Sequence, residues 1–194
     1  MTTPPAPGGT PRTPGGPDAF EAEWRFVLDF YALEGVSAAC LELQDRLGVD
    51  VTVLLHAVWL HCRHGQTPDT AAIETFDAAV RPWRTQVTVP LRALRRMLKS
   101  APFPIPADIV ARTRRHIADA ELGAEQGAFA LLVDMYARIG MADSAAPGDP
   151  GDPVGVVVRH YATAGDGPTP AQACAGALAA MRQAVRACRR KGTG

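Results

Sequence analysis

The sequence has no excess of charge of either sign. Its 194 residues include 20 Lys and Arg and 20 Asp and Glu, so the formal net charge is zero. Hydrophobic residues make up 47% and charged residues 21%, the proportions of an ordinary globular protein. A chain disordered throughout would need low hydrophobicity and a large net charge, and a strongly basic nucleic-acid binder would need a positive total. The composition excludes both.

The sequence also lacks a long apolar run. The longest stretch without a formal charge covers 167–181, contains two prolines and is too short to span a bilayer. The N-terminus carries no charged segment followed by an apolar one, the pattern of a secretion signal. We therefore expect a cytoplasmic protein with no membrane partner.

Cysteine is sparse, and no two cysteines form a C-x-x-C pair. The four are Cys40, Cys62, Cys174 and Cys188. Each lies among apolar residues at a helix-like spacing, so we expect small buried hydrophobic side chains rather than disulfides or metal ligands.

Recognisable catalytic and cofactor motifs are missing as well. His56, His61 and His64 follow one another without an H-E-x-x-H motif, which favours surface histidines at a polar helix end over a zinc site. No glycine-rich phosphate loop is present, and no sequence motif pairs a Ser or Cys nucleophile with a His base. We expect no metal, no cofactor and no enzymatic activity, although an enzyme stays an open alternative.

Proline and glycine are abundant but concentrated in a few segments. Residues 1–17 contain ten of them and one charge, which predicts a disordered tail. Residues 141–153 carry an Ala-Pro-Gly-Asp-Pro-Gly-Asp-Pro run that predicts a linker. We accordingly predict a helical core domain over 18–140 and a C-terminal helical appendage over 154–191 that packs on the core.

Between these segments the apolar residues repeat with a helical period. The pattern predicts an all-α fold, a compact bundle of about six to eight helices in which one long helix covers about 106–139. Gly123 and Gly127 lie inside that helix and would let a neighbouring helix pack closely. The β-branched run at 154–161 resembles a strand, but a lone strand has no partner here, so we favour a short helix.

Local signals predict several helix boundaries. Thr67 and Pro68 are typical of a helix start, and Pro82 predicts a kink or an end in the helix that follows. Thr88 and Pro90 repeat the start signal for a separate helix over 91–98. At the C-terminus, Thr169 and Pro170 predict the beginning of an Ala-rich helix.

The zero net charge is the sum of opposed blocks. Residues 18–50 carry a net charge of −6, residues 81–116 of +8, residues 117–181 of −6 and residues 182–191 of +5. The block 81–116 predicts either a surface for RNA or an acidic partner, or arginines paired with acidic helices inside the fold, and we favour the second. The arginines of 182–191 fall on a final helical turn, where cations complement the helix dipole.

Several segments, in one order, resemble a bacterial protein family that carries only the label domain of unknown function 2390. The segments are 24–31, 35–45, 48–55, 59–60, 83–84, 90–96 and 120–125. Tryptophan, the Leu-Gln-Asp triplet at 43–45 and the run Leu-Arg-Ala-Leu-Arg-Arg at 91–96 make the resemblance specific. It covers about residues 22–135 and implies a small helical bacterial protein with no assigned activity.

The same segments suggest one polar cluster. We hypothesise that side chains on four segments meet in a buried or half-buried network, which would fix how the helices pack. The candidates are Tyr31, Gln44, Asp45, Arg92, Arg95, Arg96, Glu121 and Glu125. If they line a pocket instead, they are the best candidates for a ligand site.

Three functions are consistent with these features. We favour a non-enzymatic interaction or scaffold module with a protein partner. The alternatives are an RNA or ribonucleoprotein binder that uses residues 81–116, and an enzyme that acts on a small anionic substrate.

Overall fold

A computed structural model describes residues 17–100, 102–139, 151–162, 172 and 174–192. All its elements are helical, and the described residues contain no strand, which confirms the all-α prediction. The predicted tail, apart from Pro17, and residues 141–150 of the predicted linker lie outside the described residues. The division into domains stays a prediction.

Three helices open the chain: α1 (Pro17–Tyr31), α2 (Val36–Leu47) and α3 (Val51–Trp59), the last continuing as a π-helical turn, η1 (Leu60–His64). Gly48 ends α2 with φ 67°, a left-handed conformation that glycine adopts without steric cost. Asp50 then caps α3, since its carboxylate accepts the backbone N–H groups of Thr52 and Val53 at 2.7 and 3.2 Å.

The next helix runs without a break through Pro82. It comprises α4 (Thr70–Trp83), the π-helical turn η2 (Arg84–Thr88) and α5 (Val89–Ser100). Of the kink or end predicted at Pro82, the end is therefore excluded, and the predicted new start at Thr88 is wrong. The Thr85 hydroxyl donates to the carbonyl oxygens of Arg81 and Pro82 at 2.9 and 3.2 Å, which satisfies acceptors around the proline.

The start of α4 also differs from the prediction. Its N-cap is Asp69, whose carboxylate accepts the Ala72 backbone N–H at 2.8 Å. Thr67 lies three residues before the helix begins, and its hydroxyl bonds to His61 Nδ1 at 2.8 Å.

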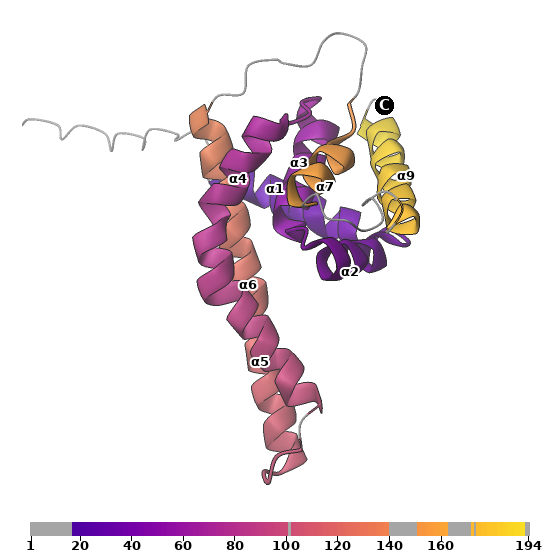
Figure 1. The fold of residues 1–194 in the computed structure, drawn as a ribbon. Coiled ribbons are helices and arrows are strands. Elements are labelled where there is room, and N and C mark those ends of the chain that lie inside the picture. The colour runs from indigo at the N-terminus through magenta and orange to yellow at the C-terminus, as the bar shows by residue number, and fades with distance from the viewer. Residues whose placement is uncertain (1–16, 101, 140–150, 163–171, 173, 193–194) are drawn as a thin grey trace, which may run out of the picture.

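The long helix α6 (Ala107–Ile139) matches the predicted range and lies antiparallel beside α4 and α5 (Figure 1). Gly127 leaves room for the Trp83 ring, whose Cζ2 would be 3.4 Å from an added Cβ, and Trp83 Nε1 donates to the Ala124 carbonyl at 2.8 Å. A close helix contact at Gly127 is thus confirmed, whereas Gly123 has no neighbour within 4 Å of an added Cβ.

Two further helices complete the described chain. They are α7 (Pro153–Tyr161), the short helix expected in place of a strand, and α9 (Ala175–Gly192). The predicted start of the last helix at Thr169 lies outside the described residues. Both helices supply core residues, among them Val154, Val157, Leu178 and Met181.

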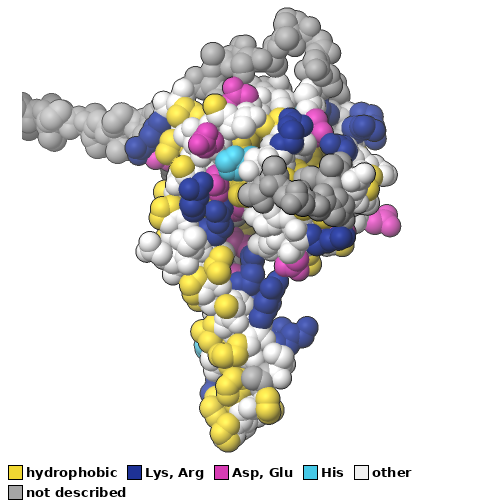
Figure 2. Space-filling model, in the orientation of Figure 1, with side chains coloured by type: hydrophobic (Ala, Val, Ile, Leu, Met, Phe, Trp, Pro, Cys, Tyr) yellow, Lys and Arg dark blue, Asp and Glu magenta, His cyan; other side chains and the backbone are white. Residues whose placement is uncertain are grey.

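Helix α5 and the facing part of α6, residues 89–100 and 107–120, form an arm that projects from the body of the other helices (Figure 1). Large apolar side chains stay exposed along it, including Leu94, Met97 and Ile109. Figure 2 shows this apolar surface reaching the tip, with cationic side chains beside it. Within the described part of the chain, no helix has the length and apolar character to cross a membrane.

Candidate functional site

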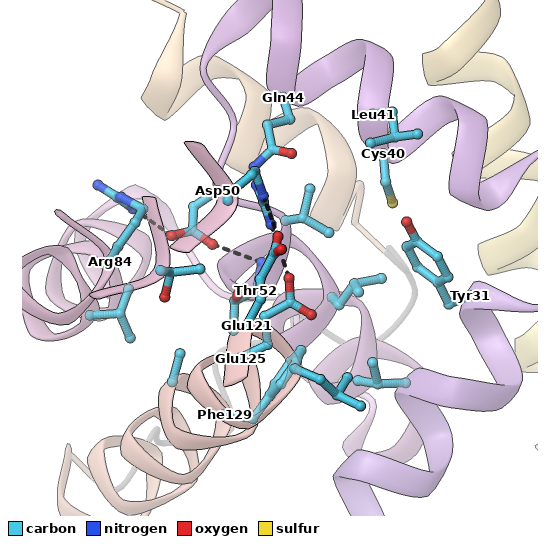
Figure 3. A pocket seen from close by; sticks show the side chains of 18 of the residues that line it. Tyr31, Cys40, Leu41, Gln44, Asp50, Thr52, Arg84, Glu121, Glu125 and Phe129 are labelled. Atoms are coloured by element: carbon cyan, nitrogen blue, oxygen red, sulfur yellow. Dashed lines mark hydrogen bonds and ion pairs between the residues drawn. The ribbon is translucent and has the colours of Figure 1, made fainter. Parts of the chain in front are cut away.

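A cavity of about 400 Å³ lies where the arm joins the body. Helices α1, α2 and α3 form its body side, and η2, α5 and α6 form its arm side (Figure 3). We call it the arm-root cavity. Its volume is within the range of roughly 300–1,000 Å³ that is usual for small-molecule sites.

One wall of the arm-root cavity is apolar. Trp24, Val27 and Leu28 reach it from α1, and Leu55 and Phe129 reach it from α3 and α6. The rings of Trp24 and Phe129 lie 5.7 Å apart, centroid to centroid. A rigid aromatic wall of this kind favours an apolar ligand body.

The polar part of the lining is held together by ion pairs between α5 and α6. Arg92 donates to Glu121 through Nε at 2.8 Å and to Glu125 through Nη2 at 2.9 Å. Arg95 also donates to Glu121, which is only 8% exposed. Glu121 therefore joins both arginines and fixes the position of α5 against α6.

The two carboxyl groups differ in their pKa. Burial would raise the pKa of Glu121, but hydrogen bonds and charge from Arg95 and Arg92 outweigh burial and lower it. Burial raises the pKa of Glu125, and the neighbouring Glu121 adds to the effect, against the opposing charge of Arg92. Glu121 consequently keeps its charge to a lower pH than an ordinary glutamate, whereas Glu125 is the carboxyl more easily protonated.

At the rim the pairing is much looser. Arg96 Nη2 lies 3.4 Å from Asp45 Oδ1, and both side chains are 57% exposed. A long, exposed ion pair has little net stabilising effect, so Arg96 can turn to another anion at small cost.

Among the polar side chains that line the cavity, those of Tyr31, Gln44, Thr52 and Thr88 make no hydrogen bond with a described residue. In Figure 3 the Tyr31 hydroxyl points toward the sulfur of the neighbouring Cys40. Burial raises the pKa of the Tyr31 hydroxyl, and the nearby Cys40 and Glu125 add to it, so the group stays a neutral donor. These groups are available to a bound molecule.

The structure brings most of the candidate residues to this one place. All but Asp45 line the cavity, and Asp45 pairs with Arg96 at its rim. The hypothesised single network is divided, however: Arg92 and Arg95 bond with the two glutamates, Arg96 pairs with Asp45, and Tyr31 and Gln44 bond to neither group. That these residues bind a ligand stays a prediction.

Sequence reasoning missed a second polar group next to the cavity. Arg84 donates to Asp50 at 2.6 Å and to Asp77 at 2.7 Å, and the Tyr161 hydroxyl donates to Asp77 at 2.6 Å. Burial would raise the pKa of Asp77, but hydrogen bonds from Tyr161, Arg81 and Arg84 outweigh it and lower the pKa. Only the capping role of Asp50 had a local signal, because Asp77 and Tyr161 lie 84 positions apart.

The prediction of surface histidines is wrong for two of the three. His56 is fully buried and bonds to the equally buried Glu23, with Nδ1 and Oε1 2.7 Å apart. His61 is 3% exposed and bonds to Thr67. The helix that carries both histidines, α3 with η1, is surrounded by the core on nearly every side. The polar residues in the sequence of this segment do not reveal that. Across the described residues, no group of three His, Cys, Asp or Glu could hold a metal ion.

The cysteines and the basic block are also placed. Cys40 and Cys174 are buried, Cys62 and Cys188 are half-buried, and all four are free thiols. The pairing predicted for the basic block is confirmed for Arg92, Arg95 and Arg96, each of which pairs with a carboxylate.

Comparison with known proteins gives one match. The profile of a family described as "Protein of unknown function (DUF2390)" matches residues 22–132, which confirms the resemblance seen in the sequence. Neither the curated proteins nor the solved structures provide a match. All residues that line the arm-root cavity, from Trp24 to Phe129, lie within the matched stretch.

Proposed function

The chain belongs to the DUF2390 family, whose description assigns no function, and we propose from the site itself that the protein is a non-enzymatic interaction module that binds a small amphipathic molecule in the arm-root cavity. The observation that carries the proposal is a single cavity lined both by aromatic side chains and by arginines.

The charges favour an anionic head group. Four arginines line the cavity against three carboxylates, and burial favours the neutral form of one of these, Glu125. Arg96 has one weak partner, at 3.4 Å, so it is the cation most readily given to a ligand. The apolar body of the ligand would then lie against Trp24 and Phe129.

We place binding ahead of catalysis for a structural reason. Arg92 and Arg95 are each bonded to Glu121, and together they hold α5 to α6, so these groups are committed to the fold. An enzyme would require a nucleophile or an acid–base pair in the cavity that could act on a small anionic substrate. That alternative stays a prediction.

Two fluorescent probes test the proposal. 8-Anilino-1-naphthalenesulfonate has an aromatic body and an anionic head, and N-phenyl-1-naphthylamine is the same body without the sulfonate. We expect both to bind in a saturable, one-to-one manner. Arg96→Gln should weaken the anionic probe by about tenfold through the loss of one charge-assisted contact, whereas Asp45→Asn should tighten it by freeing Arg96.

A matched control comes from the same helix. Glu42 forms a surface pair with Arg46 at 3.2 Å and does not line the cavity, so Glu42→Gln should leave both probes unchanged. The neutral probe should respond to none of the three substitutions. Equal effects of Asp45→Asn and Glu42→Gln, or equal loss of both probes in Arg96→Gln, would contradict the proposal.

The arm supports a second candidate, a protein partner. Exposed Leu94, Met97 and Ile109 form an apolar surface, and cationic residues of the basic block lie along the same arm (Figure 2). This combination fits an acidic amphipathic helix, which would bury the apolar side chains and neutralise the arginines. A second copy of the chain fits less well, because its basic arm would bring positive charges against positive charges.

Site-specific photo-crosslinking tests this candidate. A photoreactive residue at Met97 of the full chain, in nuclease-treated extract of the native cell, should give an adduct that maps to an acidic helical segment. The matched position is Leu131, which is equally exposed on α6 but lies outside the arm, and it should give no such adduct. Adducts to RNA when nuclease is omitted, or to a second copy of the chain, would count against it.

A further inference from the structure

A second hollow lies on the other side of the body, between the start of α7 and the face of α9. Its volume is about 450 Å³, and His61 of η1 forms part of its wall. Four arginines from one face of α9 line it: Arg182, Arg186, Arg189 and Arg190. Their spacing places them side by side because residues four and seven or eight apart share a helix face.

Two of these arginines are held in place. Arg182 donates to Asp152 Oδ2 through Nε at 2.9 Å and through Nη2 at 2.6 Å. Asp152 is itself fixed, because it caps α7 by accepting the Gly155 backbone N–H at 3.0 Å. On the other side, Arg189 Nη1 lies 3.3 Å from His61 Nε2.

The His61 contact defines a neutral imidazole. His61 Nδ1 lies 2.8 Å from the Thr67 hydroxyl, and burial followed by the Arg189 charge lowers the pKa of His61. A neutral ring whose Nε2 accepts from Arg189 positions that guanidinium without cancelling its charge. The chain enters this wall at Gly151, whose φ of 62° brings it so close to Thr67 that an added Cβ would lie 2.6 Å from the hydroxyl oxygen.

The lining residues leave a positive charge. Asp152 is the one carboxylate among the described residues that line the hollow, against four arginines. Arg186, between the two held arginines in sequence, makes no hydrogen bond or ion pair with any described residue. A helix dipole accounts for cations in the last turn of α9, but Arg182 and Arg186 precede that turn.

We propose that this hollow binds a small molecule through a phosphate group, with Arg186 as a direct ligand and Arg182 and Arg189 as positioned neighbours. Phosphate matches the site because planar guanidinium groups recognise its oxygens in pairs and because several arginines on one face suit a group of more than one negative charge. The hollow is separate from the arm-root cavity and does not depend on its ligand.

Calorimetric titration of the full chain with inorganic pyrophosphate, at constant ionic strength, tests the proposal. We expect saturable one-to-one binding. Arg186→Gln should weaken it by about tenfold, since one charge-assisted contact is lost. Asp152→Asn should tighten it, because asparagine retains an acceptor for the Gly155 N–H and removes the competing charge.

The control is Arg138→Gln, which removes one positive charge from an exposed pair with Asp134 on α6 and should leave binding within twofold. Circular dichroism of each variant shows whether it is folded. Absence of pyrophosphate binding, or equal binding by the wild type and Arg186→Gln, would overturn the proposal. Tighter Arg186-dependent binding of a single-stranded RNA oligonucleotide would overturn it in favour of a polynucleotide.

Discussion

The arm-root cavity and the α7–α9 hollow both contain four arginines, yet they use them differently. In the cavity, Arg92 and Arg95 bond to carboxylates of a neighbouring helix. In the hollow, Asp152 is the one carboxylate among the described lining residues, and Arg186 pairs with no described residue. An arginine paired across two helices stabilises their packing, whereas an arginine without a carboxylate gains most from an external anion.

The two sites also differ in their relation to the family. The cavity lies wholly within the matched residues 22–132. Of the described residues that line the hollow, only His61 lies within the matched stretch. The others belong to residues 151–190. The cavity is thus built from the part of the chain that defines the family, and the hollow requires the C-terminal helices.

The largest expected difference between the sites is in stability. Glu121→Gln places an amide nitrogen against a guanidinium and removes the charge that joins Arg92 and Arg95. We expect a loss of about 2 kcal/mol in the free energy of unfolding, less than for a fully buried pair because both arginines are partly exposed. Glu125→Gln, which leaves Glu121 in place, should cost below about 1 kcal/mol. Urea denaturation measures both, and equal losses would contradict the distinct role of Glu121.

The same two carboxyls should give opposite pH dependences. The lowered pKa of Glu121 stabilises the fold above the ordinary glutamate pKa, and this contribution is lost as pH falls through the lowered value. The raised pKa of Glu125 stabilises the fold in acid and is lost as pH rises through the raised value. From pH 4 to 7, the deficit of Glu121→Gln relative to wild type should grow, and that of Glu125→Gln should shrink. Deficits that change in the same direction would refute this assignment.

In the hollow, His61 should also make the free energy of unfolding depend on pH. This effect should be smaller than that of the two glutamates and should occur at higher pH. Because its pKa is lowered in the fold, its contribution is present above the ordinary histidine pKa of about 6.5 and is lost as pH falls through the lowered value. His61→Gln should reduce the decline of unfolding free energy between pH 7 and 5. Arg189→Gln should reduce it in part, since burial still lowers the pKa. An unchanged decline in His61→Gln would exclude this role.

The smallest effect is expected at Arg186. The side chain is exposed and has no described partner, so Arg186→Gln should change the free energy of unfolding by less than about 0.5 kcal/mol. A large loss, measured by the same urea denaturation, would show that Arg186 is structural, as Arg92 is.

The helices and the arm side of the cavity could be predicted because their signals are local or periodic. The apolar period located α6 within a residue of its observed start, and the spacing of Arg92 and Arg96 placed both on one face of α5. Asp45 and Arg96 were expected to meet, and they do, although in an exposed pair at the rim.

Other features depend on contacts between distant segments. The burial of His56 is set by Glu23 and by Phe76, whose ring lies 4.8 Å away edge-on, and no local pattern reveals them. The helix continues past Pro82 as a π-helical turn, in which the Thr85 hydroxyl donates to the carbonyls of Arg81 and Pro82. The hollow is formed by η1, α7 and α9, which are far apart in the sequence. The sequence therefore showed the spacing of the α9 arginines, but it did not show that Asp152 and His61 face them.

The most direct test of the binding proposal is a crystal structure of the protein with 8-anilino-1-naphthalenesulfonate. The account predicts the aromatic body against Trp24 and Phe129, with the sulfonate bonded to Arg96 and the pair with Asp45 broken. A probe bound elsewhere, or a cavity filled by side chains with Arg96 still paired to Asp45, would contradict it.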